Sequence, residues 1–186
     1  MVTKFLCANV WPLVKRKGQE EIRVCFMREL LKADEIRIFV AYFAQDSLKA
    51  LNEIVNSYKI KRVCLILGMY NEKNLSDNSR KLALSINAKW KREGVGEIRI
   101  TKKWRYHGKL YFFLKNNQIF SVITGSANLS FLCARQHPQY EEAVFFDDPE
   151  SLKYFSEHMN DLFDPKITEN IERYFFTKNS SKNLVE

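Results

Sequence analysis

Hydrophobic and polar residues alternate with two different spacings along the first half of the chain. Between residues 20 and 32, apolar side chains such as Ile22, Phe26 and Leu30 recur every four positions, which predicts an amphipathic helix. The next segment, EIRIFVAYF over residues 35–43, is a near-continuous apolar run rich in β-branched and aromatic residues. Such a run predicts a strand that is buried on both faces of a covered sheet.

The same order of elements then repeats. Helical spacing returns over residues 45–57, and a second buried strand, KRVCLILGM, is expected over residues 61–69. Strand, helix and strand within about 35 residues predict a right-handed parallel crossover. A polar loop over residues 71–79, a helix over residues 80–92 and a short strand over residues 97–102 are expected next.

The second half of the chain begins with two strands joined by a turn. The strands are expected over residues 109–114 and 119–124, with Asn116 and Asn117 at the turn. The remaining expected elements are a short helix over residues 129–134 capped by Asn128 or Ser130, a strand over residues 141–146 and a helix over residues 149–163. Together the elements predict an α/β fold with a mixed, largely parallel β-sheet and helices on both faces.

The length of 186 residues suits one domain with a proper core and is short for two. We expect that domain to span residues 1–165 and to begin with an irregular, basic segment over residues 1–19. Residues 166–186 hold one aromatic patch before a polar end, and they are expected to form a C-terminal tail or the stub of a linker.

Composition and cysteine spacing restrict the class of protein. With 46% hydrophobic and 28% charged residues, the chain has the composition of a soluble globular protein. No apolar run reaches the roughly 20 residues that cross a membrane, and the N-terminus lacks the order of a signal peptide, so a cytoplasmic protein is expected. The wide spacing of the cysteines predicts free thiols rather than disulfides or structural zinc; they are Cys7, Cys25, Cys64 and Cys133.

The net charge is +8, from 30 Lys and Arg against 22 Asp and Glu. A positive excess of this size suits a polyanionic partner, because Lys and Arg that contact phosphates release counterions. Charge alone leaves nucleic acid and an anionic membrane surface as alternatives.

The residues best suited to chemistry lie between the strands of the second half. His107 and Lys109 are two positions apart on an expected strand, so both side chains point to the same face. An imidazole can attack phosphorus or protonate an oxygen bound to it, while the ammonium neutralises phosphate charge. The TGSAN turn adds Ser126 and Asn128 as uncharged donors, and Gly125 gives access to backbone amides. This set of groups indicates a phosphodiester as substrate.

A carboxylate is the usual acceptor that fixes the tautomer of such a histidine. Glu141 or Glu142 can supply it, and on a strand only one of them can face the site. Simpler roles remain open for the polar residues of the turn. Asn128 can cap the following helix as well as bind phosphate, and Ser126 can serve turn geometry alone.

A basic, aromatic cluster leads into His107, and it has two interpretations. Its cations can be a solvated charge run or can guide phosphates. Its aromatic residues, Trp104 and Tyr106, can stack on bases or pack inside the protein. The candidate DNA-binding residues are Lys102, Lys103, Arg105, Tyr106 and, near the same end, Arg135.

The order of these residues resembles a known pattern. HGK at residues 107–109, GSAN at residues 125–128 and a downstream Glu are similar to the HxK…GSxN…E half-site of the phospholipase D superfamily. The form HGKLYFF…TGSANLS…QYEEAV resembles the nuclease branch, and most of all the catalytic domain of BfiI/NgoFVII-type restriction endonucleases. The resemblance covers about residues 20–165. One departure is Leu114, where many members of the superfamily carry an Asp; that Asp is often absent in the restriction nuclease branch.

The resemblance implies a phospholipase D-like fold and a metal-independent DNA endonuclease without a cofactor, the catalytic part of a restriction enzyme. The family mechanism needs two half-sites, so one half-site per chain implies a homodimer with a composite active site. One His107 would form a phosphohistidine intermediate, and the other would protonate the leaving oxygen and then activate water. Glu141 lies three residues before Val144, as the family's Glu does, and is therefore preferred to Glu142.

Two further expectations concern partners and alternatives. Relatives usually attach a separate sequence-recognition domain, so such a domain or an ATP-dependent subunit is expected beside DNA, and no membrane is expected. The alternatives are a lipid or RNA phosphodiesterase that uses the same site, and a catalytically silent DNA-binding module. The intact HxK, GSxN and Glu favour the catalytic alternatives.

Overall fold

The computed structural model describes residues 4–70, 75–102, 104–133 and 139–182. The strands in chain order are β1 Lys4–Cys7, β2 Glu20–Glu21, β3 Glu35–Val40, β4 Arg62–Leu67, β5 Gly96–Thr101, β6 Leu110–Lys115, β7 Gln118–Gly125, β8 Glu142–Phe146 and β9 Thr168–Asn170. The helices are α1 Ile22–Leu30, α2 Gln45–Ser57, α3 Asp77–Arg92, α4 Pro149–Leu162 and α5 Ile171–Lys182, with a 3₁₀ helix η1 at Leu129–Cys133.

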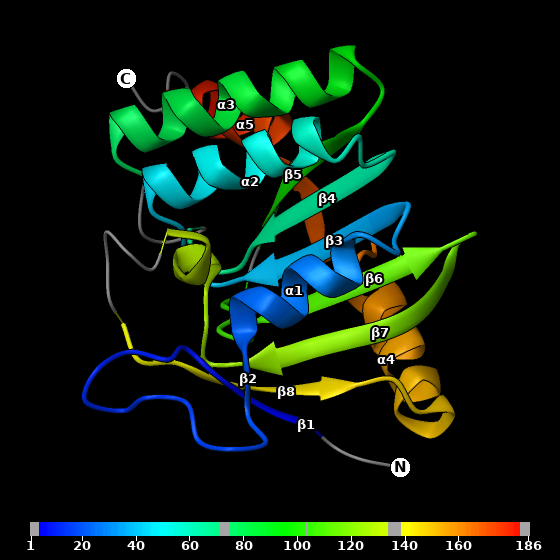
Figure 1. Ribbon diagram of the computed structural model, residues 1–186. Coiled ribbons are helices and arrows are strands. Elements are labelled where there is room, and N and C mark those ends of the chain that lie inside the picture. Colours follow the sequence, from blue (N-terminus) through cyan, green and yellow to red (C-terminus); the bar gives the residue numbers. More distant parts are fainter. Residues whose placement is uncertain (1–3, 71–74, 103, 134–138, 183–186) are drawn as a thin grey trace.

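All the described strands join one sheet in the order β2-β1-β8-β7-β6-β3-β4-β5-β9 (Figure 1). Among the pairings of the described strands, β1–β2, β3–β4 and β4–β5 are parallel, and the other five are antiparallel. The predicted mixed sheet is confirmed, but "largely parallel" holds only for β3, β4 and β5 and for the short pair of β1 and β2. A parallel pair needs a long crossover, whereas β6 and β7 are joined by a two-residue turn that forces them antiparallel.

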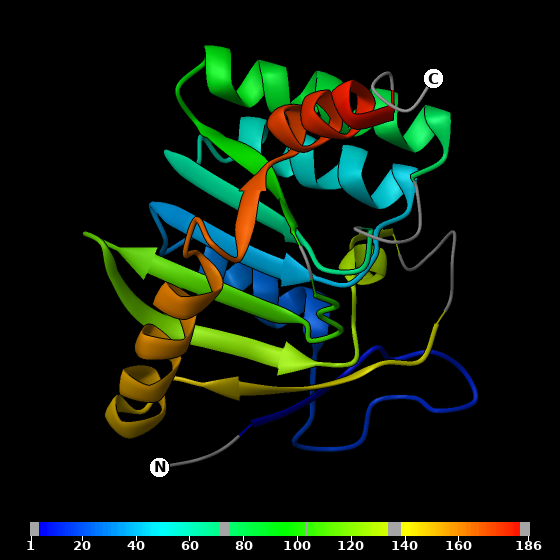
Figure 2. The same cartoon turned by 180° about the vertical axis from the view of Figure 1, so that it is seen from behind.

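Helices cover both faces of the sheet, as predicted. α1, α2 and α3 lie on one face, and α4 lies on the other, which Figures 1 and 2 show from opposite sides. The alternation of side chains along β3 explains the division: Ile36, Ile38 and Val40 join the core beneath the first three helices, whereas Phe39 joins a smaller core beneath α4. The apolar run of this strand therefore marks burial on both faces.

The turn between β6 and β7 lies at the predicted asparagines. Asn116 and Asn117 have φ angles of 52° and 65°, in the left-handed region. Asparagine tolerates this region better than most residues, and two such angles in succession match the twist of a two-residue hairpin. The two middle residues of the turn therefore fix the register that places His107 and Gly125 at the same end of the hairpin.

The N-terminal segment contains a strand where irregular structure was expected. β1 pairs antiparallel with β8 and parallel with β2, so it adds two strands to the sheet beyond β7 and β8. The strand has only four residues, KFLC, and a proline at position 12 and cations at positions 15–17 follow it, so the sequence pattern does not indicate it clearly. The partner strand supplies the pairing that the local sequence does not indicate.

The C-terminal segment also belongs to the fold, since it forms a strand and a helix that extends to Lys182, rather than a tail or linker stub from residue 166. β9 pairs antiparallel with β5, and α5 packs beside α3. Polar contacts hold these elements: the Arg99 guanidinium donates to the hydroxyl and the carbonyl oxygen of Thr168, and Lys91 forms a 2.7 Å ion pair with Glu172. A strand reading TEN has no apolar alternation, so the sequence pattern does not predict it.

Smaller differences concern helix ends. α3 begins at Asp77, three residues before its predicted start, because the Ser76 hydroxyl accepts a hydrogen bond from the Ser79 N–H and caps the helix. The short element after Asn128 is a 3₁₀ helix rather than an α-helix. The four cysteines are free, two of them buried and two half-buried. Within the described residues, no helix is long and apolar enough to cross a membrane.

Candidate active site

The predicted catalytic residues meet at one edge of the sheet. His107 and Lys109 directly precede β6, Ser126 and Asn128 directly follow β7, and Glu141 directly precedes β8. Because β7 runs antiparallel to both neighbours, the start of β6 and the start of β8 lie beside the end of β7. The sheet topology thus gathers side chains that are up to 34 positions apart, since 141 − 107 = 34.

Lys109 is a buried cation in direct contact with His107. Its side chain is only 5% exposed, and its Nζ lies 3.0 Å from Nδ1 of His107 and 2.6 Å from the His107 carbonyl oxygen. Burial lowers the pKa of Lys109 below its usual value, and the negative charge of Glu141 opposes this shift more weakly. No carboxylate of the described residues lies within 4 Å of this ammonium. The site therefore presents positive charge that an anion can neutralise.

His107 is exposed, and its contacts determine which nitrogen carries the proton. An ammonium has only donors, so Nδ1 must accept from Lys109, and the proton of a neutral imidazole then lies on Nε2. The Tyr42 ring meets the imidazole edge to face, with centroids 6.1 Å apart. In this arrangement His107 can donate a hydrogen bond from Nε2 to a group that approaches from solvent.

Glu141, not Glu142, faces the site. Its carboxylate is buried and accepts a hydrogen bond from the Ser126 hydroxyl, whose oxygen accepts in turn from the Glu142 N–H at 3.1 Å. The Glu142 side chain is exposed and accepts from the Tyr140 hydroxyl. Since a hydroxyl has one proton, Ser126 acts here as a positioning residue for Glu141, and its direct contact with phosphate stays a prediction.

The carboxylate was expected to accept from the second nitrogen of His107. Within the described chain Glu141 makes no such bond, and Nδ1 contacts Lys109 instead. Glu141 affects its surroundings through charge: it raises the pKa of Lys109 and, after burial, that of Tyr111. The buried Tyr111 hydroxyl donates to the Ala127 carbonyl oxygen at 2.7 Å and so fixes the turn between Ser126 and Asn128.

Asn128 connects the end of β7 to the end of β3. Its Oδ1 accepts a hydrogen bond from the Tyr42 N–H at 3.1 Å, whereas the Ser130 hydroxyl is buried without a partner among the described residues. The predicted capping of the following helix by either residue is therefore not what the structure has. With its oxygen engaged, Asn128 keeps its amide N–H donors for other groups, such as phosphate oxygens.

The family comparison bears on this arrangement. A model of the NgoFVII restriction endonuclease N-terminal PLD domain matches residues 20–173. The chain belongs to this family. It is accordingly a phospholipase D-type domain of the phosphodiesterase and nuclease class. No curated protein matches the chain.

Solved structures of three proteins share the fold. Nuc of Salmonella typhimurium, described as a phospholipase D family member, is 22% identical, with 86% of this chain and 92% of that chain covered at a TM-score of 0.55. NucT of Helicobacter pylori is 18% identical, with coverages of 88% and 97% at a TM-score of 0.56. Phosphatidylserine synthase of Haemophilus influenzae is 14% identical, with coverages of 90% and 39% at a TM-score of 0.59. These likenesses establish a phospholipase D-like fold.

Tyr106 packs inside the domain beside the family's HxK motif. Its ring lies against Phe39, with centroids 4.1 Å apart, and burial raises its pKa to about 12. Its backbone N–H donates to the Gly68 carbonyl oxygen at 2.9 Å, and a Cβ at Gly68 or Gly108 would overlap Tyr106. The structure shows the packing that was one of the two predicted alternatives, and contact of Tyr106 with DNA stays a prediction. The tyrosine holds the segment that presents His107.

The structure describes only two of the other four candidate DNA-binding residues. Lys102 donates to the Pro165 carbonyl oxygen at 3.2 Å, which ties its ammonium to the segment before β9. Arg105 is exposed two residues before His107. Lys103 and Arg135 lie outside the described residues. Their role in DNA binding stays a prediction for all of them.

Tyr42 is a residue of the site that sequence reasoning missed. Its N–H holds Asn128 and its ring contacts His107. Its position was a usable signal, because it follows a buried parallel strand and ligands of α/β sheets bind at the carboxyl ends of such strands. Among the described residues, no group of three or more His, Cys, Asp or Glu side chains could hold a metal ion.

Proposed function

We propose that this chain is the catalytic part of a restriction enzyme, a cytoplasmic DNA endonuclease that hydrolyses phosphodiester bonds without a metal ion. The observation that carries the proposal is the contact between an exposed imidazole, His107, and a buried cation, Lys109, that forms no ion pair with a carboxylate of the described residues. A phosphate diester supplies the missing negative charge, and the imidazole lies where it can react with it. The net charge of +8 favours a polyanionic substrate such as DNA.

The reaction needs two imidazoles, and one chain carries one HxK motif, so we propose a homodimer with a composite site. Nε2 of one His107 attacks phosphorus and the bond from phosphorus to the leaving oxygen breaks. His107 of the second copy, protonated on both ring nitrogens, donates its Nε2 proton to that oxygen and becomes neutral. The second His107 then takes a proton from water. The water oxygen attacks phosphorus and breaks the N–P bond, which restores both side chains.

The contact between Lys109 and His107 adds a step to this scheme. A nucleophilic Nε2 needs a free lone pair, so the proton must move to Nδ1, which Lys109 occupies in the free protein. Phosphate draws the ammonium towards its own oxygens and frees Nδ1. Substrate binding thus favours the tautomer of the nucleophilic His107 that carries its proton on Nδ1 and leaves the lone pair of Nε2 free. The amide donors of Asn128 stabilise the charge that develops on the non-bridging oxygens.

The test is cleavage of supercoiled plasmid by the full chain in excess EDTA. We expect nicking to persist in EDTA and to fall about 10⁴-fold or more in His107→Ala. His158→Ala is the matched control, because His158 lies on α4, stacked on Tyr154 and away from the motif. Acid-labile labelling of wild-type protein by end-labelled DNA would identify the phosphohistidine.

Each part of the proposal has its own contrary outcome. Activity in His107→Ala would refute the mechanism, and loss of nicking in EDTA would refute metal independence. A protein that remains monomeric while it cleaves would exclude the composite site. Hydrolysis of phosphatidyl or RNA substrates, with DNA left intact, would transfer the function to another branch of the superfamily. A separate recognition domain or an ATP-dependent subunit would supply sequence specificity, which purified chain alone should lack.

A further inference from the structure

The loop between β1 and β2, residues 8–18 and here called the N-terminal loop, exposes an unusual set of side chains. Trp11, Leu13 and Val14 are 84%, 53% and 56% exposed, and every residue from Trp11 to Gly18 lies at the surface. Single exposed apolar residues are ordinary, but three in four consecutive positions form a patch. Val10 and Leu13 pair as an isolated antiparallel bridge, which puts Trp11 at the tip of a tight turn.

Three consecutive cations follow this tip. Lys15, Arg16 and Lys17 are all exposed, and no carboxylate of the described residues forms an ion pair with them. An apolar tip flanked by cations is the composition of a wedge that enters a base step while neighbouring cations hold phosphates. Two such loops facing each other across a dimer axis would repel, which favours an anionic partner over a second copy.

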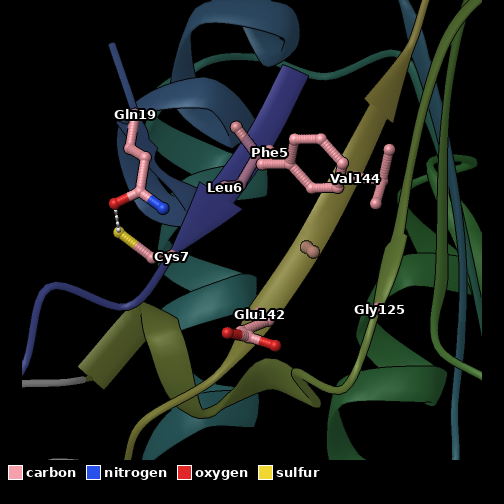
Figure 3. Close-up of a pocket in the computed structure, with 8 residues that line it drawn as sticks. Phe5, Leu6, Cys7, Gln19, Gly125, Glu142 and Val144 are labelled. Atoms are coloured by element: carbon pink, nitrogen blue, oxygen red, sulfur yellow. Dashed lines mark hydrogen bonds between the residues drawn. The ribbon is translucent and has the colours of Figure 1, made fainter. Parts of the chain in front are cut away.

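The N-terminal loop is held in shape by its own side chains. Asn9 Nδ2 donates to Glu21 Oε1, and Asn9 Oδ1 accepts from the Lys15 N–H, both at 2.8 Å. Gln19 Oε1 accepts from the Arg16 N–H at 2.8 Å and contacts the Cys7 thiol, as Figure 3 shows. Because the loop is already ordered, a partner need not meet the entropic cost of ordering it.

The same loop lies beside the candidate active site. Its first residue, Ala8, donates its N–H to the Glu141 carbonyl oxygen at 3.0 Å. Figures 1 and 2 both place the loop at the sheet edge where β7 ends and β8 begins. A pocket of about 410 Å³ runs from Gln19 at the base of the loop to Gly125, next to Ser126 (Figure 3). DNA held at His107 would therefore pass close to the loop.

We propose that the N-terminal loop binds duplex DNA beside the scissile phosphate, with Trp11 inserted at a base step and Lys15, Arg16 and Lys17 on flanking phosphates. The inference rests on the proposed function in one respect, that the bound duplex is the substrate. The family match begins at residue 20, so the loop lies outside the part of the chain that the family model describes. It gives this chain a DNA contact additional to the half-site.

The proposed role of the N-terminal loop is tested by measuring DNA binding and DNA cleavage separately. In a His107→Ala background, Trp11→Ala should weaken binding to a short labelled duplex roughly tenfold or more, because aromatic stacking on bases is lost. The matched control is Leu31→Ala, since Leu31 is 68% exposed at the end of α1, towards the opposite edge of the sheet. That variant should bind as the parent does.

The cations have a distinct readout. Replacing Lys15, Arg16 and Lys17 by Gln should reduce the magnitude of the slope of log affinity against log salt concentration by about two to three for each protomer. The control removes the same charge near the opposite edge, with Gln at Lys59, Lys61 and Arg92, which are also exposed. Its salt slope should stay close to that of the parent.

The outcomes separate this inference from the proposed function. A chain that cleaves DNA while its loop variants bind like the controls overturns the inference alone. A chain that binds DNA through the loop yet never cleaves it overturns the proposed endonuclease alone. Absence of any DNA binding, or a dimer that Trp11→Ala converts to monomers, overturns the inference, the latter because the tip would then cover a second copy.

Discussion

Buried charged side chains lie at both ends of the central strands of the sheet, but they are paired differently at the two ends. At the edge where β3 begins, Glu35 is 5% exposed and its carboxylate pairs with Arg37 at 2.5 Å and Arg62 at 2.7 Å. At the edge where β6 begins, Lys109 and Glu141 are equally buried, at 5% and 7%. These two opposite charges do not form an ion pair with each other.

The difference separates a cluster that closes on itself from one that we propose is functional. Buried charges cost free energy unless they are paired, so a cluster that serves only the fold closes on itself, as Glu35 does. Lys109 instead donates to an imidazole and a carbonyl oxygen, and it forms no ion pair with a carboxylate of the described residues. In a site of this kind the unpaired charge lowers the stability of the fold but remains available to a substrate. Perturbed pKa values are most frequent at such sites.

The largest effect expected from this comparison comes from Lys109→Met, which keeps the length of the side chain and removes the charge. Plasmid cleavage should fall about 10³-fold, the loss typical of one transition-state donor. The free energy of unfolding in urea should stay equal or rise, because an unpaired buried charge is removed. Lys115→Met is the control, at the exposed far end of β6. A strongly destabilised Lys109→Met with normal cleavage would reverse the interpretation of this edge.

Glu35→Gln should give the opposite result, and a smaller one. Loss of the carboxylate leaves Arg37 and Arg62 without their partner, and we expect the free energy of unfolding to fall by about 2 kcal/mol. Cleavage should be unchanged, since Glu35 lies at the far end of β3 from Tyr42. Asp77→Asn is the control, because its ion pair with Arg80 is exposed and should contribute well under about 1 kcal/mol. Equal losses in both variants would contradict the contrast between buried and exposed pairs.

Local sequence predicted well which residues gather at the candidate site, because short-range rules govern their placement. His107 and Lys109 lie just before β6, close to where the strand was expected to begin, and the turn at Asn116 and Asn117 depends only on side chains that accept left-handed backbone. Those two features are enough to place the HxK and GSAN segments together. The apolar run of β3 likewise predicted burial on both faces.

Long-range contacts determined what the sequence could not predict. β1 and β9 exist because partner strands accept them, β9 through side-chain hydrogen bonds to Arg99 rather than an apolar pattern. The bond between Tyr42 and Asn128 joins residues 86 positions apart. The occupation of His107 Nδ1 by Lys109 is a matter of side-chain rotamers, and no spacing rule specifies it.

The smallest effect is a pH dependence that belongs to Lys109 alone. Its pKa in the folded chain lies below the usual value of 10.5. Between that lowered pKa and 10.5 the unfolded chain binds more protons than the folded one, so stability rises with pH. The cost of burying the ammonium is therefore complete at neutral pH and relieved as the pH approaches 10.5. Wild-type protein should gain stability relative to Lys109→Met over that window.

Urea unfolding of both proteins at neutral pH and at about pH 10 measures this change as a difference of differences. Tyrosines and other groups that ionise at alkaline pH contribute to both proteins and cancel in the subtraction. The same subtraction with Lys115→Met accounts for the loss of one exposed ammonium. If the free energy of unfolding of wild type fell further below that of Lys109→Met as the pH rose, Lys109 would be stabilised as a cation in the folded chain. The candidate site would then resemble the closed cluster around Glu35 rather than an open site.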